Sequence, residues 1–188
     1  MSQELKTSIL KNTIKVFNRK GLKLTMDDIA DQMGISKKTI YKCYDSKEEI
    51  FDCIVDYIFD GIKRREKEIL GEEGLTLEER TRKLLAAFPE SYTEIDFTKL
   101  GYLKDKYPKI YRKLKRRLES GWEPTMELLE QGKKEGLYRQ DADFTIFKIM
   151  MDASVARFFE ADTLRKSRIS YVDALNQVVD ILLTGIKA

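Results

Sequence analysis

Apolar residues recur at helical spacing along almost the whole chain, and this periodicity limits the fold more than any other feature. A strand would show alternating apolar and polar residues, and such alternation is hard to find in these 188 residues. Only three prolines and ten glycines interrupt the pattern. The sequence therefore predicts an all-α fold, either as one compact unit or as a small module fused to a larger helical body.

Two short helices and their ends can be assigned in the first 35 residues. The first is expected from about Gln3 to Arg19, with Gly21 placed to end it. The second has Thr25 as its N-cap and Asp28 three residues later, a pair that resembles a capping box, and it ends at Gly34.

A third short helix and a long fourth one follow. Ser36 can cap a helix that continues through Tyr44, and Ser46 with Glu49 forms the S-x-x-E pattern that begins the long helix. Further helices are expected at about 77–88, 91–104, 108–119, 122–135, 142–160 and 170–186. Three short helices thus lead into a long one and then into a helical body.

The positive charge of the chain is concentrated in its first quarter. Residues 1–50 contain ten Lys and Arg against seven Asp and Glu, whereas the remaining residues carry 25 of each sign. The whole net charge of +3 therefore belongs to the first three helices and the start of the fourth. A basic excess of this size indicates nucleic acid only when a structural context supports it.

The chain has no histidine and only two cysteines, Cys43 and Cys53. This composition excludes a zinc finger and every nucleophile that is activated by histidine, so no metal site, cofactor or catalytic residue is expected. The two thiols are interpreted as reduced and partly buried, and a redox role for either remains an open alternative. No apolar run could span a membrane and no signal peptide is recognisable, so a cytoplasmic protein is expected.

The segment from Thr25 to Tyr44 has the order helix, glycine turn, helix, which is typical of a helix-turn-helix. In its second helix Lys37 and Tyr41 are four residues apart and share one side, and Lys38 and Lys42 are adjacent to them. Ile40 and Tyr44 point the other way and can pack on the preceding helices. The expected DNA-binding residues are Thr25, Ser36, Lys37, Lys38, Thr39, Tyr41, Lys42 and Lys47.

Residues 21–51, GLKLTMDDIADQMGISKKTIYKCYDSKEEIF, resemble the DNA-binding domain of TetR-family transcriptional regulators. Cys43 departs from the family pattern, in which a polar residue such as histidine is frequent, and Tyr44 replaces the usual phenylalanine. The matching positions are Thr25, Ile29, Ala30, Gly34, Ile35, Ser36, Ile40, Tyr41, Tyr44, Ser46, Lys47 and Glu48.

This resemblance implies a sequence-specific regulator that acts on a double-stranded DNA operator. It further implies a homodimeric repressor, released from the operator by a small apolar or amphipathic ligand. Residues 1–48 would form the DNA-binding domain, and residues 49–188 would bind the effector and dimerise. The alternative is a small all-helical protein-docking module or enzyme whose basic head does not read DNA.

Two sets of residues in the body are interpreted from their spacing. The last two helices carry wide apolar stripes that favour a four-helix dimer interface, with a monomeric core as the alternative. The expected interface residues are Phe144, Met151, Val155, Phe158, Tyr171, Leu175, Val178 and Leu182. Aromatic and thioether side chains of the body could line an apolar pocket, although ordinary core packing also explains them: Phe88, Tyr92, Tyr102, Trp122, Met126, Phe147 and Met151.

Overall fold

The computed structural model describes residues 2–89, 92, 95–159 and 163–188 and shows an all-helical protein. Among these residues no strand forms, and a single isolated bridge joins Tyr138 to Lys187. The elements are α1 (Gln3–Lys20), η1 (Gly21–Lys23), α2 (Met26–Met33), α3 (Lys37–Tyr41), α4 (Lys47–Gly71), α5 (Leu77–Leu85), η3 (Phe97–Tyr102), α6 (Leu103–Lys106), α7 (Pro108–Glu119), α8 (Glu123–Lys134), α9 (Phe144–Phe158), α10 (Thr163–Ser167) and α11 (Tyr171–Ile186).

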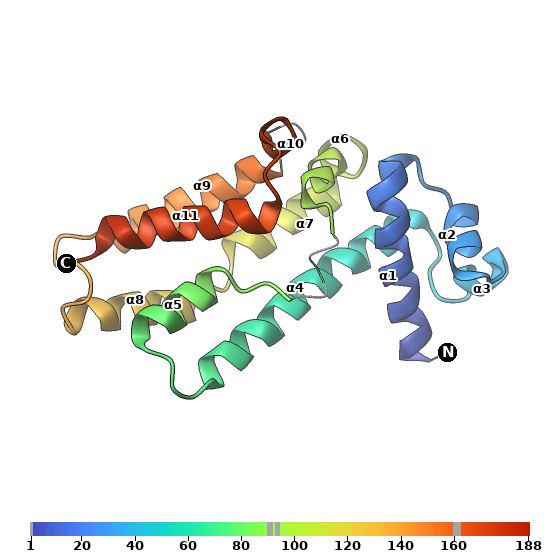
Figure 1. Ribbon diagram of the computed structural model, residues 1–188. Helices are drawn as coiled ribbons and strands as arrows, with labels where there is room; N and C mark the ends of the chain where they lie inside the picture. Colours follow the sequence, from blue (N-terminus) through green and yellow to red (C-terminus); the bar gives the residue numbers. More distant parts are fainter. Residues whose placement is uncertain (1, 90–91, 93–94, 160–162) are drawn as a thin grey trace.

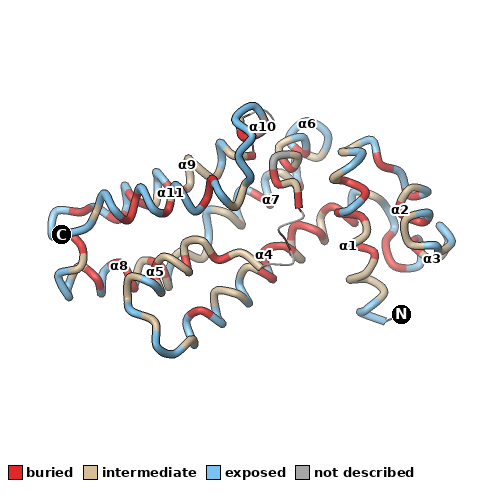
Figure 2. The backbone as a smooth tube through the Cα atoms, viewed as in Figure 1, coloured by how far each residue is buried: buried red, intermediate tan, exposed pale blue. Residues whose placement is uncertain are grey.

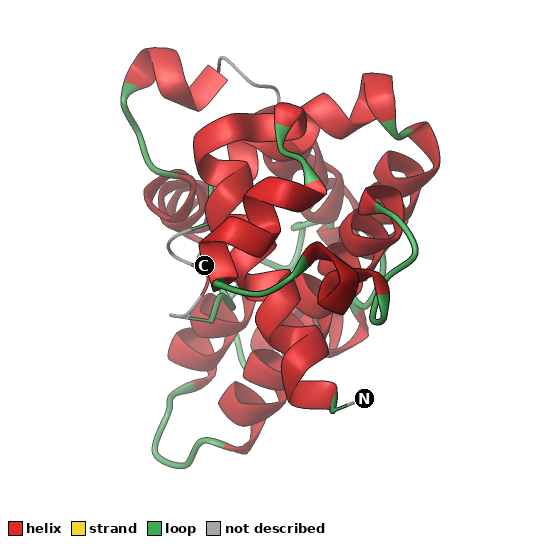
Figure 3. Ribbon diagram, turned by 90° about the vertical axis from the view of Figure 1, so that its right-hand side faces the viewer, coloured by secondary structure: helices red, strands yellow, loops and turns green. Residues whose placement is uncertain are grey.

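The short helices α1, α2 and α3 gather at one end of the molecule, and we call this part the head (Figure 1). Helix α4 begins beside them and runs into the body, where α5, α8, α9 and α11 lie at the opposite end. When the molecule is turned so that the head faces the viewer, most helices are seen to be joined by short loops (Figure 3).

One apolar core runs from the head into the body along α4, and its buried residues line the inward faces of the helices (Figure 2). Phe51 on α4 connects the two parts, because its ring packs 5.5 Å from that of Phe17 on α1 and 5.6 Å from that of Tyr107. A second core, between α8, α9 and α11, is built around Leu129, Tyr138 and Phe147. The head is therefore packed against the body and is not tethered by a free linker.

The predicted helix ends of the head are mostly confirmed. Thr25 and Asp28 form both hydrogen bonds of a capping box, and Gly34 ends α2 in the left-handed conformation with φ 63°. Ser46 caps α4 by accepting from the Glu49 backbone N–H, but the Glu49 carboxylate accepts from the N–H of Asp45 instead of Ser46. Only half of the predicted second box therefore forms.

Several predicted boundaries in the body and head differ from the structure. Helix α5 ends at Leu85 and not at residue 88, because Phe88 precedes Pro89 and a residue before proline avoids the helical region. Helix α3 ends at Tyr41, where Cys43 N–H turns back to the Ile40 carbonyl at 2.8 Å. The predicted helix at 142–160 is α9, its residue 160 lies outside the described residues, and α10 was not predicted.

The predicted helix at 91–104 is replaced, over its described part, by the 3-10 helix η3 and the start of α6. Its buried residues Phe97, Leu100 and Leu103 are three apart, and side chains at this spacing eclipse one another in a 3-10 helix. Residues 91, 93 and 94 of that prediction lie outside the described residues. The three-residue spacing was the available signal for the 3-10 conformation.

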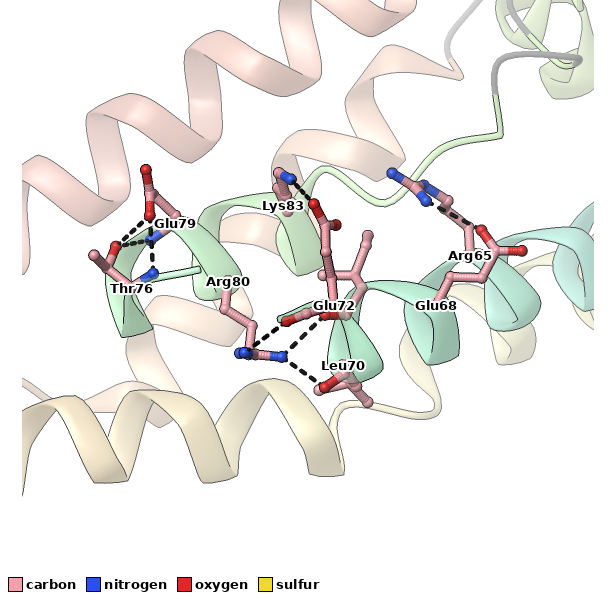
Figure 4. A network of polar contacts seen from close by, with 9 residues as sticks. Arg65, Glu68, Leu70, Glu72, Thr76, Glu79, Arg80 and Lys83 are labelled. Carbon is pink, nitrogen blue, oxygen red and sulfur yellow. Dashed lines mark hydrogen bonds and ion pairs between the residues drawn. The ribbon is translucent and has the colours of Figure 1, made fainter. Parts of the chain in front are cut away.

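The end of α4 and the start of α5 are fixed by a polar network (Figure 4). The Arg80 guanidinium donates to the carbonyls of Ile69, Leu70 and Glu72, which satisfies acceptors at the C-terminal end of α4. Thr76 and Glu79 form a capping box that begins α5. This turn holds α5 against the far half of α4.

Ion pairs join the near half of α4 to α7. The Lys113 ammonium contacts the carboxylates of Asp52 and Asp56, each at 2.7 Å, and the Arg117 guanidinium contacts that of Asp60 at 2.6 Å. These carboxylates raise the pKa of Lys113, although partial burial opposes the shift. Since the residues recur every four positions on both helices, the pairs form a ladder along the contact.

Candidate nucleic-acid interface

The inner side of α3 is fixed to the rest of the head by burial and by one long-range hydrogen bond. Ile40 and Tyr44 are buried, as their sequence positions predicted. The Tyr44 hydroxyl donates to the carbonyl of Lys6 on α1 at 3.1 Å. Burial raises the pKa of Tyr44, so this hydroxyl keeps its proton and remains a donor. Helix α3 has only five residues and is anchored to the rest of the head by Ile40 and by Tyr44 just after its end.

The outer side of α3 carries the exposed groups that the sequence indicated. Lys38, Tyr41 and Lys42 are exposed, and Tyr41 keeps 46% of its surface although it is a large aromatic residue. Within the described part of the chain neither of these lysines has an acidic partner. The helix lies at the outer edge of the head (Figure 1). These three side chains are therefore free to meet an external partner.

Other predicted DNA-binding residues already have partners in the chain. The Lys37 ammonium pairs with the Asp27 carboxylate at 2.8 Å. Ser36 caps α3, accepting from Thr39 N–H at 3.1 Å, and the two hydroxyls lie 2.8 Å apart. Thr25 caps α2. Each of these residues is exposed or half-buried. Its ion pair or capping hydrogen bond therefore leaves part of the side chain accessible to DNA.

Lys47 points into the protein and not outward. Its ammonium donates to the carbonyls of Leu22 at 3.2 Å and Leu24 at 2.7 Å. Lys106 of the body reaches the same Leu22 carbonyl at 3.5 Å. Burial and the nearby Lys106 lower the pKa of Lys47. Sequence position indicated a phosphate contact for Lys47, whereas its neighbours show a residue that ties the α1–α2 connection to α4.

The body supports the head at two further points near the end of α1. The backbone N–H of Asp96 donates to Asn18 Oδ1 at 3.0 Å, and Lys99 donates to the Asn18 carbonyl. On the head itself, the Lys20 ammonium and the Thr25 N–H lower the pKa of Asp28 to about 2. Asp28 is therefore a carboxylate at neutral pH and holds its capping position.

An apolar cavity of about 130 Å³ lies in the body. Three of the predicted ligand-binding residues line it, Phe88, Trp122 and Met151. Tyr92 lines a neighbouring groove, Phe147 lies at a surface hollow, and Met126 packs in the second core. Tyr102 is exposed and lines none of these spaces among the described residues. The structure thus brings together only part of the predicted set.

Most other residues that line the cavity were missed from the sequence. Their apolar spacing was interpreted as core packing, which gave no sign that a space lies between them. The apolar ones are Phe59, Ile62, Leu84, Leu85, Ala87 and Leu118, and Glu66, Gly121 and Thr125 also line the cavity.

The eight predicted interface residues lie on α9 and α11. Phe144, Met151, Leu175 and Leu182 are buried, and Val155, Phe158, Tyr171 and Val178 are half-buried. Val155 and Tyr171 also line the apolar cavity. Four of the eight side chains are thus covered within one chain, and the other four keep part of their surface accessible.

A different apolar face of the same two helices is exposed. Ile146, Ile149 and Met150 share one side of α9, and Ile181 of α11 keeps 69% of its surface. The sequence could not separate the two faces, because α9 is apolar around most of its circumference.

Two further classes of site were searched for among the described residues. No group of three or more His, Cys, Asp and Glu residues there could hold a metal ion. The described helices include none that is both long and apolar enough to cross a membrane. Burial raises the pKa of Cys53, which keeps this thiol protonated and lowers its reactivity.

Known proteins resemble this chain both in the sequence of the head and over nearly its whole length. The sequence model of the "Bacterial regulatory proteins, tetR family" matches residues 9–54, which span α1 to the start of α4. The HTH-type transcriptional regulator YvaF of Bacillus subtilis is 26% identical over 180 residues, covering 96% of this chain and 94% of that protein. The HTH-type transcriptional repressor KstR2 of Rhodococcus jostii is 26% identical over 184 residues, covering 89% and 88%.

A TetR transcription regulator from Haloarcula marismortui has the same fold, with a TM-score of 0.75 over 100% of both chains at 14% identity. The fold and the comparisons agree: the chain has a helix-turn-helix with an exposed cationic face and an all-helical body, and the proteins similar to it are transcriptional regulators. Residues 9–54 therefore form a DNA-binding domain of the tetR family, and over nearly its whole length the chain is similar to transcriptional regulators that have this domain.

Proposed function

We propose that this regulator represses transcription as a homodimer and that a small ligand in the body controls its release from the operator. The observation that carries the proposal is the outer face of α3, where Lys38, Tyr41 and Lys42 are exposed on a helix held by buried residues. A side chain on a fixed helix can be placed in the major groove with little loss of conformational freedom. The relative KstR2 carries the name of a repressor, which supports this direction of control.

We assign reading of the operator to the head, residues 1–48, and effector binding and dimerisation to residues 49–188. Lysine side chains on α3 would neutralise phosphates or donate to guanine, and the Tyr41 hydroxyl would meet a phosphate or base edge. The hydroxyls of Thr25, Ser36 and Thr39 can accept or donate at the phosphates beside the groove while they cap their helices. A regulator that reads operator DNA acts in the cytoplasm, where bacterial DNA lies.

The dimer is proposed to form through the exposed apolar face of α9 and α11. Ile146, Ile149, Met150 and Ile181 form a patch that a second copy could cover, and the exposed Ala153 on the same side of α9 permits close approach of helices. A two-fold dimer presents two heads to two half-sites, about 34–36 Å apart for one turn of DNA. A change in the separation of the heads would then prevent simultaneous docking.

The proposal is tested by fluorescence anisotropy of the purified protein on DNA from upstream of its own gene, with a scrambled duplex as the comparison. Binding should be selective, and the logarithm of the affinity should fall with that of the salt concentration at roughly −0.9 per phosphate contacted. Lys38→Ala and Tyr41→Phe should each weaken binding, and loss of a phosphate contact at Lys38 should reduce the slope by about one.

Lys115→Ala provides the matched control, because Lys115 is an exposed lysine on α7 of the body. It should leave both affinity and slope unchanged. Equal affinities for the wild type and both α3 variants, with intact folding by circular dichroism, would exclude α3 as the reading helix. Absence of binding to either duplex would favour a protein-docking role for the basic head.

A further inference from the structure

A wide polar groove borders the apolar cavity of the body. It encloses about 690 Å³ and is lined by α4, by Lys11 of α1 and by Phe88, Pro89 and Tyr92 after α5. Phe88 lines both the groove and the apolar cavity, so its ring forms a shared wall between them. This ring is held by neighbours, with centroids 4.9 Å from Phe97 and 5.8 Å from Tyr171. The two spaces therefore adjoin at Phe88, and a ligand that entered both would pass beside its ring.

The floor of the groove is built closely against α4. The Tyr92 hydroxyl donates to the carbonyl of Tyr57 at 2.8 Å. A Cβ atom at Gly61 would lie 2.1 Å from that hydroxyl oxygen, so glycine is required for the tyrosine to reach the helix backbone. The groove thus has a fixed floor and is not an accidental gap between side chains.

Among the described residues that line the groove, cations outnumber acids. Lys11, Arg64 and Arg65 line it together with Glu68. Glu68 accepts from Arg65 at 3.0 Å, as Figure 4 shows. Within the described residues Lys11 and Arg64 form no ion pair, so two positive charges of the groove have no acidic partner there.

The cavity on the other side of Phe88 favours an apolar group. Its volume of about 130 Å³ is close to the roughly 150 Å³ of an engineered cavity that binds benzene. The groove is much larger than one carboxylate requires, since a water molecule takes about 30 Å³ of liquid volume. A ligand that uses both spaces therefore carries a ring-sized or short-chain apolar end and an anionic end of some bulk.

We propose that the effector is an amphipathic anion, whose apolar end fills the cavity beside Trp122 and whose carboxylate or phosphate binds Arg64 and Lys11 in the groove. This inference rests on the proposed control of the regulator by a ligand. Arginine suits the role because its planar group can donate two parallel hydrogen bonds to a carboxylate or phosphate. A cationic ligand of the same shape would be repelled, and a neutral one would gain nothing from the two charges.

The chain supplies its own reporter for the test, because Trp122 is its only tryptophan and lines the apolar cavity. The probes are 4-phenylbutyrate, 4-phenylbutyl phosphate, 4-phenylbutanol and 4-phenylbutylamine, which share a tail and differ in head group. Each is titrated into the full-length protein while tryptophan emission is followed with excitation at 295 nm. Both anions should bind at least about tenfold more tightly than the alcohol, because charge-assisted hydrogen bonds stabilise only the anions. The amine should bind more weakly than the alcohol.

Arg64→Ala should remove most of the preference for the anions and leave the affinity for the alcohol unchanged, and Lys11→Ala should reduce the preference further. Lys67→Ala is the matched control, since Lys67 is an exposed cation of α4 that does not line the groove. A tighter phosphate than carboxylate would assign a phosphate-bearing head, and the reverse would assign a carboxylic acid. Equal affinities for the anions and the alcohol, or an unchanged preference in Arg64→Ala, would overturn the proposal.

The same titrations are repeated on the protein bound to its operator, which separates the ligand class from the proposed function. An anion that binds selectively and lowers the affinity for DNA supports both. An anion that binds selectively without any effect on DNA binding supports the ligand class and refutes ligand-controlled release. Intact DNA binding without an anion preference would overturn the ligand class alone.

Discussion

Tyr44 shows which properties of a residue can be predicted from the sequence and which need the structure. Its position opposite the cations predicted burial, and the structure confirms this. The bond from its hydroxyl to the Lys6 carbonyl spans 38 residues, and no local pattern indicates such a partner. The phenylalanine that is usual at this position in the family pattern would pack equally well and lack the bond.

The residues whose partners are near in sequence were predicted best. The cap of α2 depends on groups three residues apart, so Thr25 and Asp28 could be assigned from spacing alone. Lys47 was assigned from its place at the start of α4, but the carbonyls that it meets are 23 and 25 residues away. Long-range contacts of this kind decide where a flexible side chain points.

Asp28 makes the stability of the head depend on pH in the acid range. Its pKa is lowered from 3.8 to about 2, so the folded state is stabilised above pH 4 and loses this contribution as the pH falls towards 2. We expect the difference in urea midpoint between wild type and Asp28→Asn to shrink between pH 4 and pH 2. Asp31→Asn is the control on the same helix, because Asp31 forms no ion pair within the described residues. A difference that does not change with pH would contradict the role of the carboxylate.

At the scale of helices, the sequence correctly predicted those whose ends and apolar faces are marked by nearby residues. Helices with a clear start signal and an apolar stripe were found within a few residues of their bounds: α1 and α2 have a cap residue, and α7 begins at Pro108. The segment containing η3 was not, because its three-residue apolar spacing also suits an α-helix and its contact with Asn18 of α1 spans 78 residues. For α9 the existence of the helix was predicted, and the face turned to the core was not, since both faces are apolar.

Helix α8 contains a glycine whose role lies in packing. A Cβ atom at Gly132 would lie 2.4 Å from the ring of the buried Tyr138, so Gly132→Ala should destabilise the protein although alanine is the better helix former. We expect a loss of about 1–3 kcal/mol in the free energy of unfolding by urea. Gly71→Ala is the matched control, because nothing lies within 4 Å of its added atom, and it should be neutral or stabilising. Equal stability of the two variants would show that Tyr138 moves aside easily.

At the scale of the whole molecule, the continuous core fixes the position of the head relative to the body. The apolar contacts through Phe51, together with the bonds at Asn18 and Lys106, leave the connection without a free hinge among the described residues. The sequence indicated two domains with a boundary at residue 48, and the apolar core continues across this position along α4. A ligand in the body can therefore act on the head only through a movement of packed helices.

The proposed dimer predicts a sharp difference between two exposed isoleucines. Ile181→Asp places a charge in the proposed interface and should convert the protein to a monomer in sedimentation velocity. Binding to the operator should weaken at the same time, because only one head can then dock on each molecule. Ile169→Asp is the control, since Ile169 is exposed before α11 and outside the patch. A variant Ile181→Asp that stays dimeric would move the interface elsewhere.

The ion pairs between α4 and α7 would oppose a shift of α4 along its axis more in one direction than in the other. Acidic residues occur on α4 at 48, 52, 56 and 60, and position 64, the next in this series, is an arginine. If α4 moved by one turn, about 5.4 Å, towards its own C-terminal end, Arg117 would meet Asp56 and Lys113 would keep carboxylates on both sides. The opposite step would bring Arg117 against Arg64, two like charges. Such a movement would therefore be opposed in one direction only, and the opposing residue is Arg64, to which we assign the anion in the groove.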